Sequence, residues 1–165
     1  AAGAVPWDPP VYPLVVKPTD QGSSIGVSKV TCREELPPAI AAARRYSGRV
    51  LVEEFIQGRE LTVGLVGSLA LPVVEIKPKH ALFDFTAKYT AGLTDYVVPA
   101  PLDDATARRV QEAGVLAHEA LGCRHVSRTD IILNEANVPV VLEVNTIPGF
   151  TPTSLLPKAA AAVGI

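Results

Sequence analysis

The feature that most constrains the fold is the repeated interruption of short apolar runs by proline or glycine. These interruptions divide the chain into short elements, and the order of those elements indicates the fold class. The 165 residues include 15 Pro and 12 Gly. β-Branched runs between these breakers predict strands, and apolar residues at helical spacing predict helices. The order lacks a strict βαβ alternation, which favours an α+β fold. The predicted strands are 14–17, 27–30, 50–56, 60–67, 70–77, 96–98, 128–133 and 140–144; the helices are 34–46, 103–121 and 152–163; 83–93 is predicted as a long ordered loop.

Composition excludes several classes of protein. Hydrophobic residues make up 48% of the chain and charged residues 19%, so a buried core is expected. A formal net charge of −2 argues against a partner such as nucleic acid or an anionic membrane. The longest uncharged stretch, 61–74, is too short to span a bilayer, and no secretory signal is visible. The two cysteines fit a reducing compartment, so a cytoplasmic location is expected.

The most informative polar pattern lies on two strands near the C-terminus. Residues two apart on a strand face the same side, so Arg128 shares a face with Asp130, and Glu143 shares one with Asn145. An antiparallel hairpin centred on 136–137 sets Asp130 opposite Glu143 and Arg128 opposite Asn145. Two carboxylates and an amide oxygen form a ligand set for Mg²⁺. The alternative is a solvated strand face with an Arg–Asp salt bridge.

A second pattern is the small, polar loop 22–26, Gly-Ser-Ser-Ile-Gly, between two strands. Its backbone N–H groups and hydroxyls can approach phosphate oxygens, and Lys17 on the preceding strand supplies positive charge. No Walker-type or GxGxxG motif is present. The alternative is that the loop is only a turn.

Two further segments suit a nucleotide but have plain alternatives. Residues 53–56, Glu-Glu-Phe-Ile, end a strand, and Glu60 follows a short turn, which suits adenine and ribose recognition. A charged strand end at the surface explains the same residues equally well. Lys88 and Tyr89 lie in the aperiodic loop, where solvated side chains are the default.

In order, these segments resemble an ATP-grasp enzyme, and the chain is similar to the D-alanine–D-alanine ligase family. The resemblance runs from Leu14 to the end and is most specific in LEVNTIPGFTPTSLLPKAA. It implies an α+β ATP-grasp fold of antiparallel sheets with packed helices, truncated at the N-terminus. It also implies a partial small lobe at 1–57, with the phosphate loop and adenine-side strand, and a C-terminal lobe at 58–165, with the metal and second-substrate site.

The resemblance also implies roles for individual residues. The expected ATP-binding residues are Lys17, Ser24, Glu53, Phe55, Ile56, Glu60 and Lys88. The expected ligands of two Mg²⁺ ions, for which Mn²⁺ is an alternative, are Asp130, Glu143 and Asn145. The expected catalytic residues are Arg128 and Gly149 at the oxyanion, with Ser23 and Tyr89 closing the site. Ser154 and Leu155 are expected to receive the carboxylate of the second D-alanine.

The implied activity is ATP-dependent joining of two D-alanines through an acyl phosphate, as in peptidoglycan precursor synthesis. Family members carry a further N-terminal domain, so this chain alone is expected to bind Mg-ATP weakly or not at all and to make no dipeptide. The full-length protein is expected to be a homodimer. The alternatives are a non-catalytic or degenerate nucleotide-binding module, and an ATP-grasp ligase with a different amine or hydroxy-acid acceptor.

Overall fold

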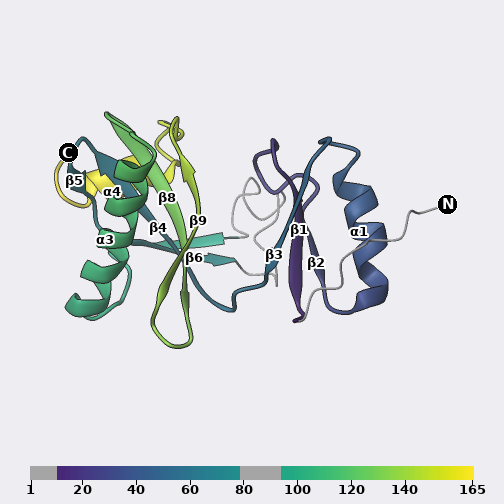
Figure 1. Cartoon of the computed structure of the whole chain (residues 1–165). Helices are drawn as coiled ribbons and strands as arrows, with labels where there is room; N and C mark the ends of the chain where they lie inside the picture. Colours follow the sequence, from purple (N-terminus) through teal and green to yellow (C-terminus); the bar gives the residue numbers. More distant parts are fainter. Residues whose placement is uncertain (1–10, 79–93) are drawn as a thin grey trace. The chain divides into compact units, whose positions relative to one another are not determined.

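The computed structural model describes residues 11–78 and 94–165. Its described chain forms two compact units, and the division falls between Phe55 and Ile56. The first unit contains residues 11–55, and the second contains Ile56–Lys77 and Thr94–Ile165. Figure 1 labels the elements of both units. Lys88, Tyr89 and the predicted loop 83–93 lie outside the described residues.

The first unit is a three-stranded antiparallel sheet covered by one helix. The strand order is β2–β1–β3, with β1 at Leu14–Pro18, β2 at Ser28–Val30 and β3 at Val50–Glu54. Leu14 and Val16 point to the same face and pack with Val30 against helix α1 (Leu36–Ala43). The opposite face of β1 carries Val15 and Lys17, so alternation along the strand separates core from polar surface.

The first helix is shorter than the predicted 34–46. Residues Arg33–Glu35 form the 3-10 turn η1, because the Glu35 carboxylate accepts hydrogen bonds from the Thr31 backbone N–H (2.7 Å) and hydroxyl (3.0 Å). Pro37 and Pro38 then fall in the first turn of α1, as predicted, where a missing N–H disturbs no helical bond.

The second unit is a six-stranded sheet of order β7–β6–β4–β8–β9, with β5 paired to β4. Every pairing recorded for β4 and for β8 in this sheet is antiparallel. The strands are β4 (Gly58–Val66), β5 (Leu69–Ala70), β6 (Val74–Pro78), β7 (Thr94–Val97), β8 (Val126–Asn134) and β9 (Pro139–Asn145).

Two helices pack on opposite faces of β4. On one face, α3 (Asp104–Ala120) packs against Leu61, Val63 and Leu65. On the other face, α4 (Leu155–Ala161) lies over Gly64, where an added Cβ would be 2.5 Å from Leu156 Cδ1. The face that α4 covers at Gly64 also carries Glu60 and Thr62, so the helix borders one end of a polar strand face.

Two further predicted elements, besides the first helix, were wrong in extent. The strand 70–77 is split into β5 and β6, because Pro72 has no N–H to donate and Leu71 N donates instead to Gly64 O (2.9 Å). The helix predicted over 152–163 is limited to α4, because Ser154 N donates to Thr151 O (2.9 Å) in a turn ahead of it.

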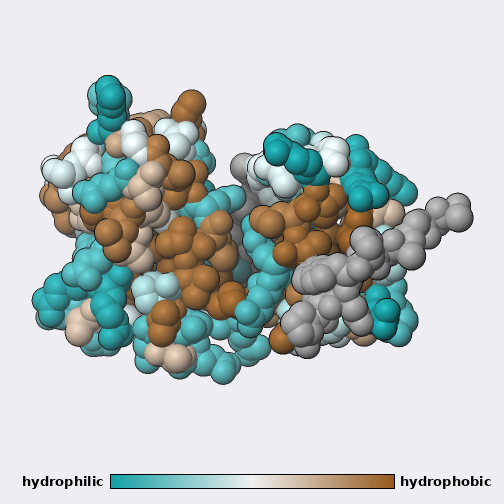
Figure 2. Space-filling view, viewed as in Figure 1, coloured by the Kyte–Doolittle hydropathy of each residue, from teal (hydrophilic) through white to brown (hydrophobic). Residues whose placement is uncertain are grey.

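Several hydrophobic side chains of the described residues are exposed to solvent. Figure 2 shows hydrophobic side chains at the surface of both units among hydrophilic ones. Leu116 and Leu121 are exposed examples at the end of the long helix. Exposed hydrophobic residues of this kind are ordinary in folded proteins. No helix among the described residues is both long and apolar enough to cross a membrane.

Candidate functional site

The β8–β9 hairpin confirms the predicted register of the polar strand pair. Asp130 is paired with Glu143, and Arg128 with Asn145. The register shifts between Asp130 and Ile131, where a β-bulge pairs Ile131 with Val141 and leaves Leu142 as the additional residue. The bulge was not predicted. It lies directly beside the carboxylate pair, and the register of the ladder is regular on both sides of it.

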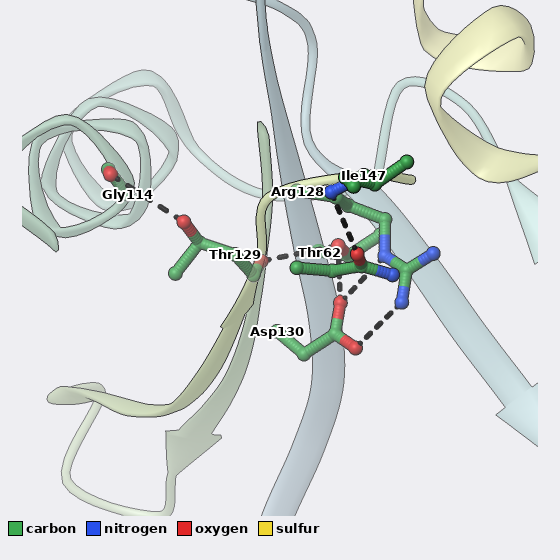
Figure 3. A network of polar contacts seen from close by, with 7 residues as sticks. Thr62, Gly114, Arg128, Thr129, Asp130 and Ile147 are labelled. Atoms are coloured by element: carbon green, nitrogen blue, oxygen red, sulfur yellow. Dashed lines mark hydrogen bonds and ion pairs between the residues drawn. The ribbon is translucent and has the colours of Figure 1, made fainter. Parts of the chain in front are cut away.

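Asp130 is the most constrained side chain of this face. Arg128 binds it with two parallel hydrogen bonds, Nε to Oδ1 and Nη2 to Oδ2, both 2.9 Å. The Thr62 hydroxyl donates to Oδ1 at 2.7 Å from the neighbouring strand β4 (Figure 3). The side chains of Arg128 and Asp130 are 19% and 18% exposed. The Arg–Asp salt bridge of the alternative interpretation is therefore present, and it lies within the same strand face as the other predicted ligands.

Glu143 and Asn145 complete this face. Glu143 is exposed and makes no hydrogen bond or ion pair with any described residue. Asn145 Oδ1 accepts a hydrogen bond from Ile147 N at 3.1 Å, which bends the chain into the following loop. The carboxylate of Glu143 is thus available to a ligand, and the amide oxygen of Asn145 keeps a second lone pair.

The loop after β9 brings together the residues predicted for the oxyanion and the second substrate. A Cβ on Gly149 would lie 2.7 Å from Ser154 Oγ, so a larger residue at this position would displace the Ser154 hydroxyl. Ser154 Oγ lies 2.8 Å from Thr151 Oγ1 and 3.2 Å from Thr151 N, and it does not cap α4. Leu155 packs against the core beneath that helix.

Glu60 lies on the same sheet face as the carboxylate pair. It is paired with Ile132 on β8 and lies two residues before Thr62, which is paired with Asp130. Glu60, the predicted ribose-binding residue, and Thr62, which binds Asp130, are therefore neighbours on one face of β4. Ile56 is half-buried in the connection before β4.

The first unit holds the other predicted nucleotide residues on the face of its sheet away from α1. Lys17 Nζ lies 2.6 Å from Glu53 Oε1, across β1 and β3. Phe55 follows β3, and its ring lies 3.7 Å from Lys29 Nζ on β2. These contacts place two lysines, a carboxylate and an aromatic ring side by side on one sheet.

The loop between β1 and β2 contains several residues with positive φ. Ser23 and Ser24 have φ values of 53° and 60°, and Gly26 has 74°. Ile25 N donates to Gly22 O (3.1 Å), and Val27 N donates to Ser24 O (3.3 Å). These hydrogen bonds make residues 22–27 two consecutive turns, and turn conformations are among those whose N–H groups can form anion-binding surfaces.

Outside the strand face, the clearest perturbed group is Glu75 on β6. Burial acts to raise the pKa of Glu75, but the hydrogen bond from Arg59 and the positive charges of Arg59 and Lys77 outweigh burial and hold that pKa below its usual value. Arg59 Nε is 2.7 Å from Oε1, and Lys77 Nζ is 3.3 Å from Oε2 without hydrogen-bond geometry. Glu75 is paired across from Leu61, on the α3 side of the sheet, so this pair supports the structure and does not face the polar strands.

Among the described residues, no group of three or more His, Cys, Asp or Glu side chains is placed to hold a metal ion. The donor set on β8 and β9 consists instead of two carboxylates and one amide. Thr62 and Lys29 were missed from the sequence. Thr62 lies in an apolar run, and only the pairing of β4 with β8 reveals its partner Asp130, which is 68 residues away in the sequence.

Solved structures resemble this arrangement closely. The VanG D-Ala:D-Ser ligase from Enterococcus faecalis matches 93% of the chain with a TM-score of 0.83 and 39% sequence identity. A D-alanine–D-alanine ligase from Bacillus anthracis matches 93% of the chain with a TM-score of 0.81 and 37% identity. The fold and the polar strand face define an α+β protein of the ATP-grasp class.

Comparison of the sequence with known families identifies one family within this class. The family described as "D-ala D-ala ligase C-terminus" matches residues 8–165, and the chain belongs to this family. D-alanine–D-alanine ligases from Halalkalibacterium halodurans and Methylacidiphilum infernorum are 47% and 48% identical to it, over 93% and 98% of the chain. The chain spans 52% of the length of each of these two relatives.

Proposed function

We propose that this chain is the ATP-grasp part of an ATP-dependent ligase that joins two D-alanines. The observation that carries the proposal is the strand face on which Asp130 is paired with Glu143 and Arg128 with Asn145. The relatives named D-alanine–D-alanine ligase and the B. anthracis ligase solved in complex with ATP, 35% identical with a TM-score of 0.77, support it.

The donor set of this face fits a hard divalent cation. Carboxylate and amide oxygens are preferred by Mg²⁺, which keeps further positions for water and phosphate oxygens. Two carboxylates facing each other across a ladder repel each other, and a cation between them removes that repulsion. Asp130, Glu143 and Asn145 would hold two Mg²⁺ ions, or Mn²⁺ in their place. When bound, the ions would neutralise charge on the transferring phosphoryl group.

The predicted nucleotide-binding residues would hold ATP. Lys17 would bind the phosphates, and the amides around Ser23 and Ser24 would cover them. Glu53 and Phe55, with Ile56 of the second unit, would line the adenine. Glu60 would bind the ribose hydroxyls. Lys88 and Tyr89 are proposed to contact the phosphates and to close the site against Ser23.

The reaction takes two steps. The carboxylate of one D-alanine attacks the γ-phosphorus of ATP, breaks its bond to ADP and forms an acyl phosphate. The amine of the second D-alanine attacks the acyl carbon, loses a proton and expels inorganic phosphate. Arg128 and the Gly149 N–H would stabilise the negative oxygen of the tetrahedral intermediate. Ser154 and Leu155 would orient the carboxylate of the second D-alanine.

A second acceptor is favoured by one observation. The VanG structure, which matches with a TM-score of 0.83, is described as a D-Ala:D-Ser ligase. D-Serine is therefore the alternative second substrate. Mass spectrometry of products, with D-alanine, D-serine and D-lactate supplied separately, distinguishes the acceptors.

Turnover by the complete polypeptide encoded by the gene tests the proposal. Asp130→Asn and Glu143→Gln are expected to lower product formation by at least about 100-fold, because each removes a carboxylate ligand of the cations that would neutralise charge on the transferred phosphoryl group. Glu135→Gln, at an exposed turn of the same hairpin, is the matched control and is expected to be fully active. Wild-type-like turnover in either of the first two variants would refute the metal assignment.

The remaining expectations concern the protein as a whole. The chain alone is proposed to make no dipeptide, since the relatives are about twice as long. Residues 1–57 and 58–165 are proposed as the two lobes. We also propose a cytoplasmic homodimer in the complete protein, acting on small molecules, with neither nucleic acid nor membrane as a partner.

A further inference from the structure

Thr62 is directly paired with Asp130 across β4 and β8, and its hydroxyl donates to Asp130 Oδ1 at 2.7 Å. The threonine is 1% exposed. We infer that Thr62 is a positioning residue, whose hydroxyl fixes the Asp130 carboxylate in the orientation that receives a divalent cation. This inference rests on the proposed function and adds to it a residue that touches neither metal nor substrate.

The count of acceptor sites on Asp130 indicates which oxygen is left for a cation. Two carboxylate oxygens offer about four lone-pair sites. Oδ1 accepts from Arg128 Nε and from Thr62, and Oδ2 accepts from Arg128 Nη2. Both sites of Oδ1 are taken and one site of Oδ2 remains. Thr62 thereby directs the open site to Oδ2.

Arg128 cannot supply this orientation alone. Its side chain is long and rotates about several bonds, so a carboxylate bound only to the guanidinium would move with it. Threonine is branched at Cβ and stiff at χ1, and Thr62 is buried in the central strand of the sheet. The rigid partner of Asp130 is therefore the threonine.

The Thr62 hydroxyl has one proton and two neighbouring acceptors. Thr129 O lies at 3.0 Å and Asp130 Oδ1 at 2.7 Å. The shorter contact to the charged oxygen is the stronger of the two. The substitution Thr62→Val removes the hydroxyl and keeps the branched shape of the side chain, whereas Thr62→Ser keeps the hydroxyl.

Thr129 offers a matched control on the adjacent strand. It is also fully buried, but its hydroxyl points to Gly114 O of α3 at 3.5 Å, away from Asp130 (Figure 3). Thr129→Val therefore removes a buried hydroxyl from the same sheet without touching the Asp130 carboxylate.

The test is Mn²⁺ binding by the complete polypeptide with a non-hydrolysable ATP analogue, followed through the paramagnetic resonance of free Mn²⁺. Thr62→Val is expected to weaken binding about 10- to 100-fold, the range found for partners of metal ligands. Thr62→Ser and Thr129→Val are expected to bind Mn²⁺ as the parental protein does. Metal-free melting curves check folding; should Thr62→Val not fold, Thr62→Cys, a weak donor of similar size, is expected to show the same loss.

Two results would overturn the inference. One is parental Mn²⁺ affinity in Thr62→Val, and the other is an equal loss in Thr129→Val. If Asp130→Asn loses Mn²⁺ while Thr62→Val keeps it, the inference fails and the proposed function stands. If the parental protein binds no Mn²⁺ with the analogue, both fail.

Discussion

At the residue scale, the sheet of the second unit carries two salt bridges, one on each face, in different surroundings. Arg59 and Glu75 form a salt bridge on the α3 side, and Arg128 and Asp130 form one on the opposite side. The Glu75 carboxylate is not open to a ligand, because its side chain is only 7% exposed and is paired with Arg59 and Lys77. The second salt bridge adjoins the exposed carboxylate of Glu143, so this face offers open oxygens to a ligand.

The Glu75 salt bridge predicts a pH dependence of stability. Because the folded pKa of Glu75 is below its ordinary 4.5, its contribution is complete above that pH and is lost as pH falls through the folded pKa. Glu75→Gln is expected to lower the free energy of unfolding by about 1–2 kcal/mol at pH 7. The difference from the parental protein should shrink below pH 4.5.

Urea denaturation between neutral and acid pH measures this. Glu135→Gln, at the exposed hairpin turn, serves as the control and should change stability by less than about 0.5 kcal/mol. A constant difference between Glu75→Gln and the parental protein at all pH values would contradict the assignment of the shift to the salt bridge.

At the element scale, the sequence predicted the polar hairpin better than its surroundings. The alternation of side chains determines which residues of β8 and β9 share a face. The turn centred on residues 136–137 determines the register of the two strands, so the pairing of Asp130 with Glu143 could be predicted from the sequence. The bulge at Leu142 could not, because alternation does not show one additional residue. Nor could Thr62, since the pairing of β4 with β8 depends on tertiary packing and not on a local pattern.

The contact between β4 and β8 predicts an effect of Gly58. A Cβ there would overlap the backbone oxygen of Leu133 and lie 2.8 Å from Ile132 Cγ2. Backbone atoms of a paired strand cannot move aside, so Gly58→Ala is expected to lower the free energy of unfolding by about 1–3 kcal/mol.

Thermal or urea unfolding of Gly58→Ala measures this loss. Gly48→Ala is the matched control, because a Cβ at Gly48 meets nothing within 4 Å, and it is expected to leave stability unchanged or slightly higher. Equal stability of the two variants would show that β4 and β8 do not approach as described at Gly58.

At the scale of the whole molecule, the candidate residues are divided between two units. Lys17, Glu53 and Phe55 belong to the first, and the carboxylates on β8 and β9 belong to the second. The resemblance to the ligase family implies a role in one reaction for both sets, whereas local sequence patterns predict each set separately. The first unit holds residues proposed to bind phosphates, and the second holds residues proposed to bind a metal.

A crystal structure of the complete protein with Mg²⁺ and ADP tests the central claim most directly. The account predicts Mg²⁺ about 2.1 Å from oxygens of Asp130, Glu143 and Asn145, with nucleotide phosphate oxygens in its remaining positions. Mg²⁺ bound elsewhere, with Asp130 held only by Arg128 and Thr62 and Glu143 in solvent, would contradict it.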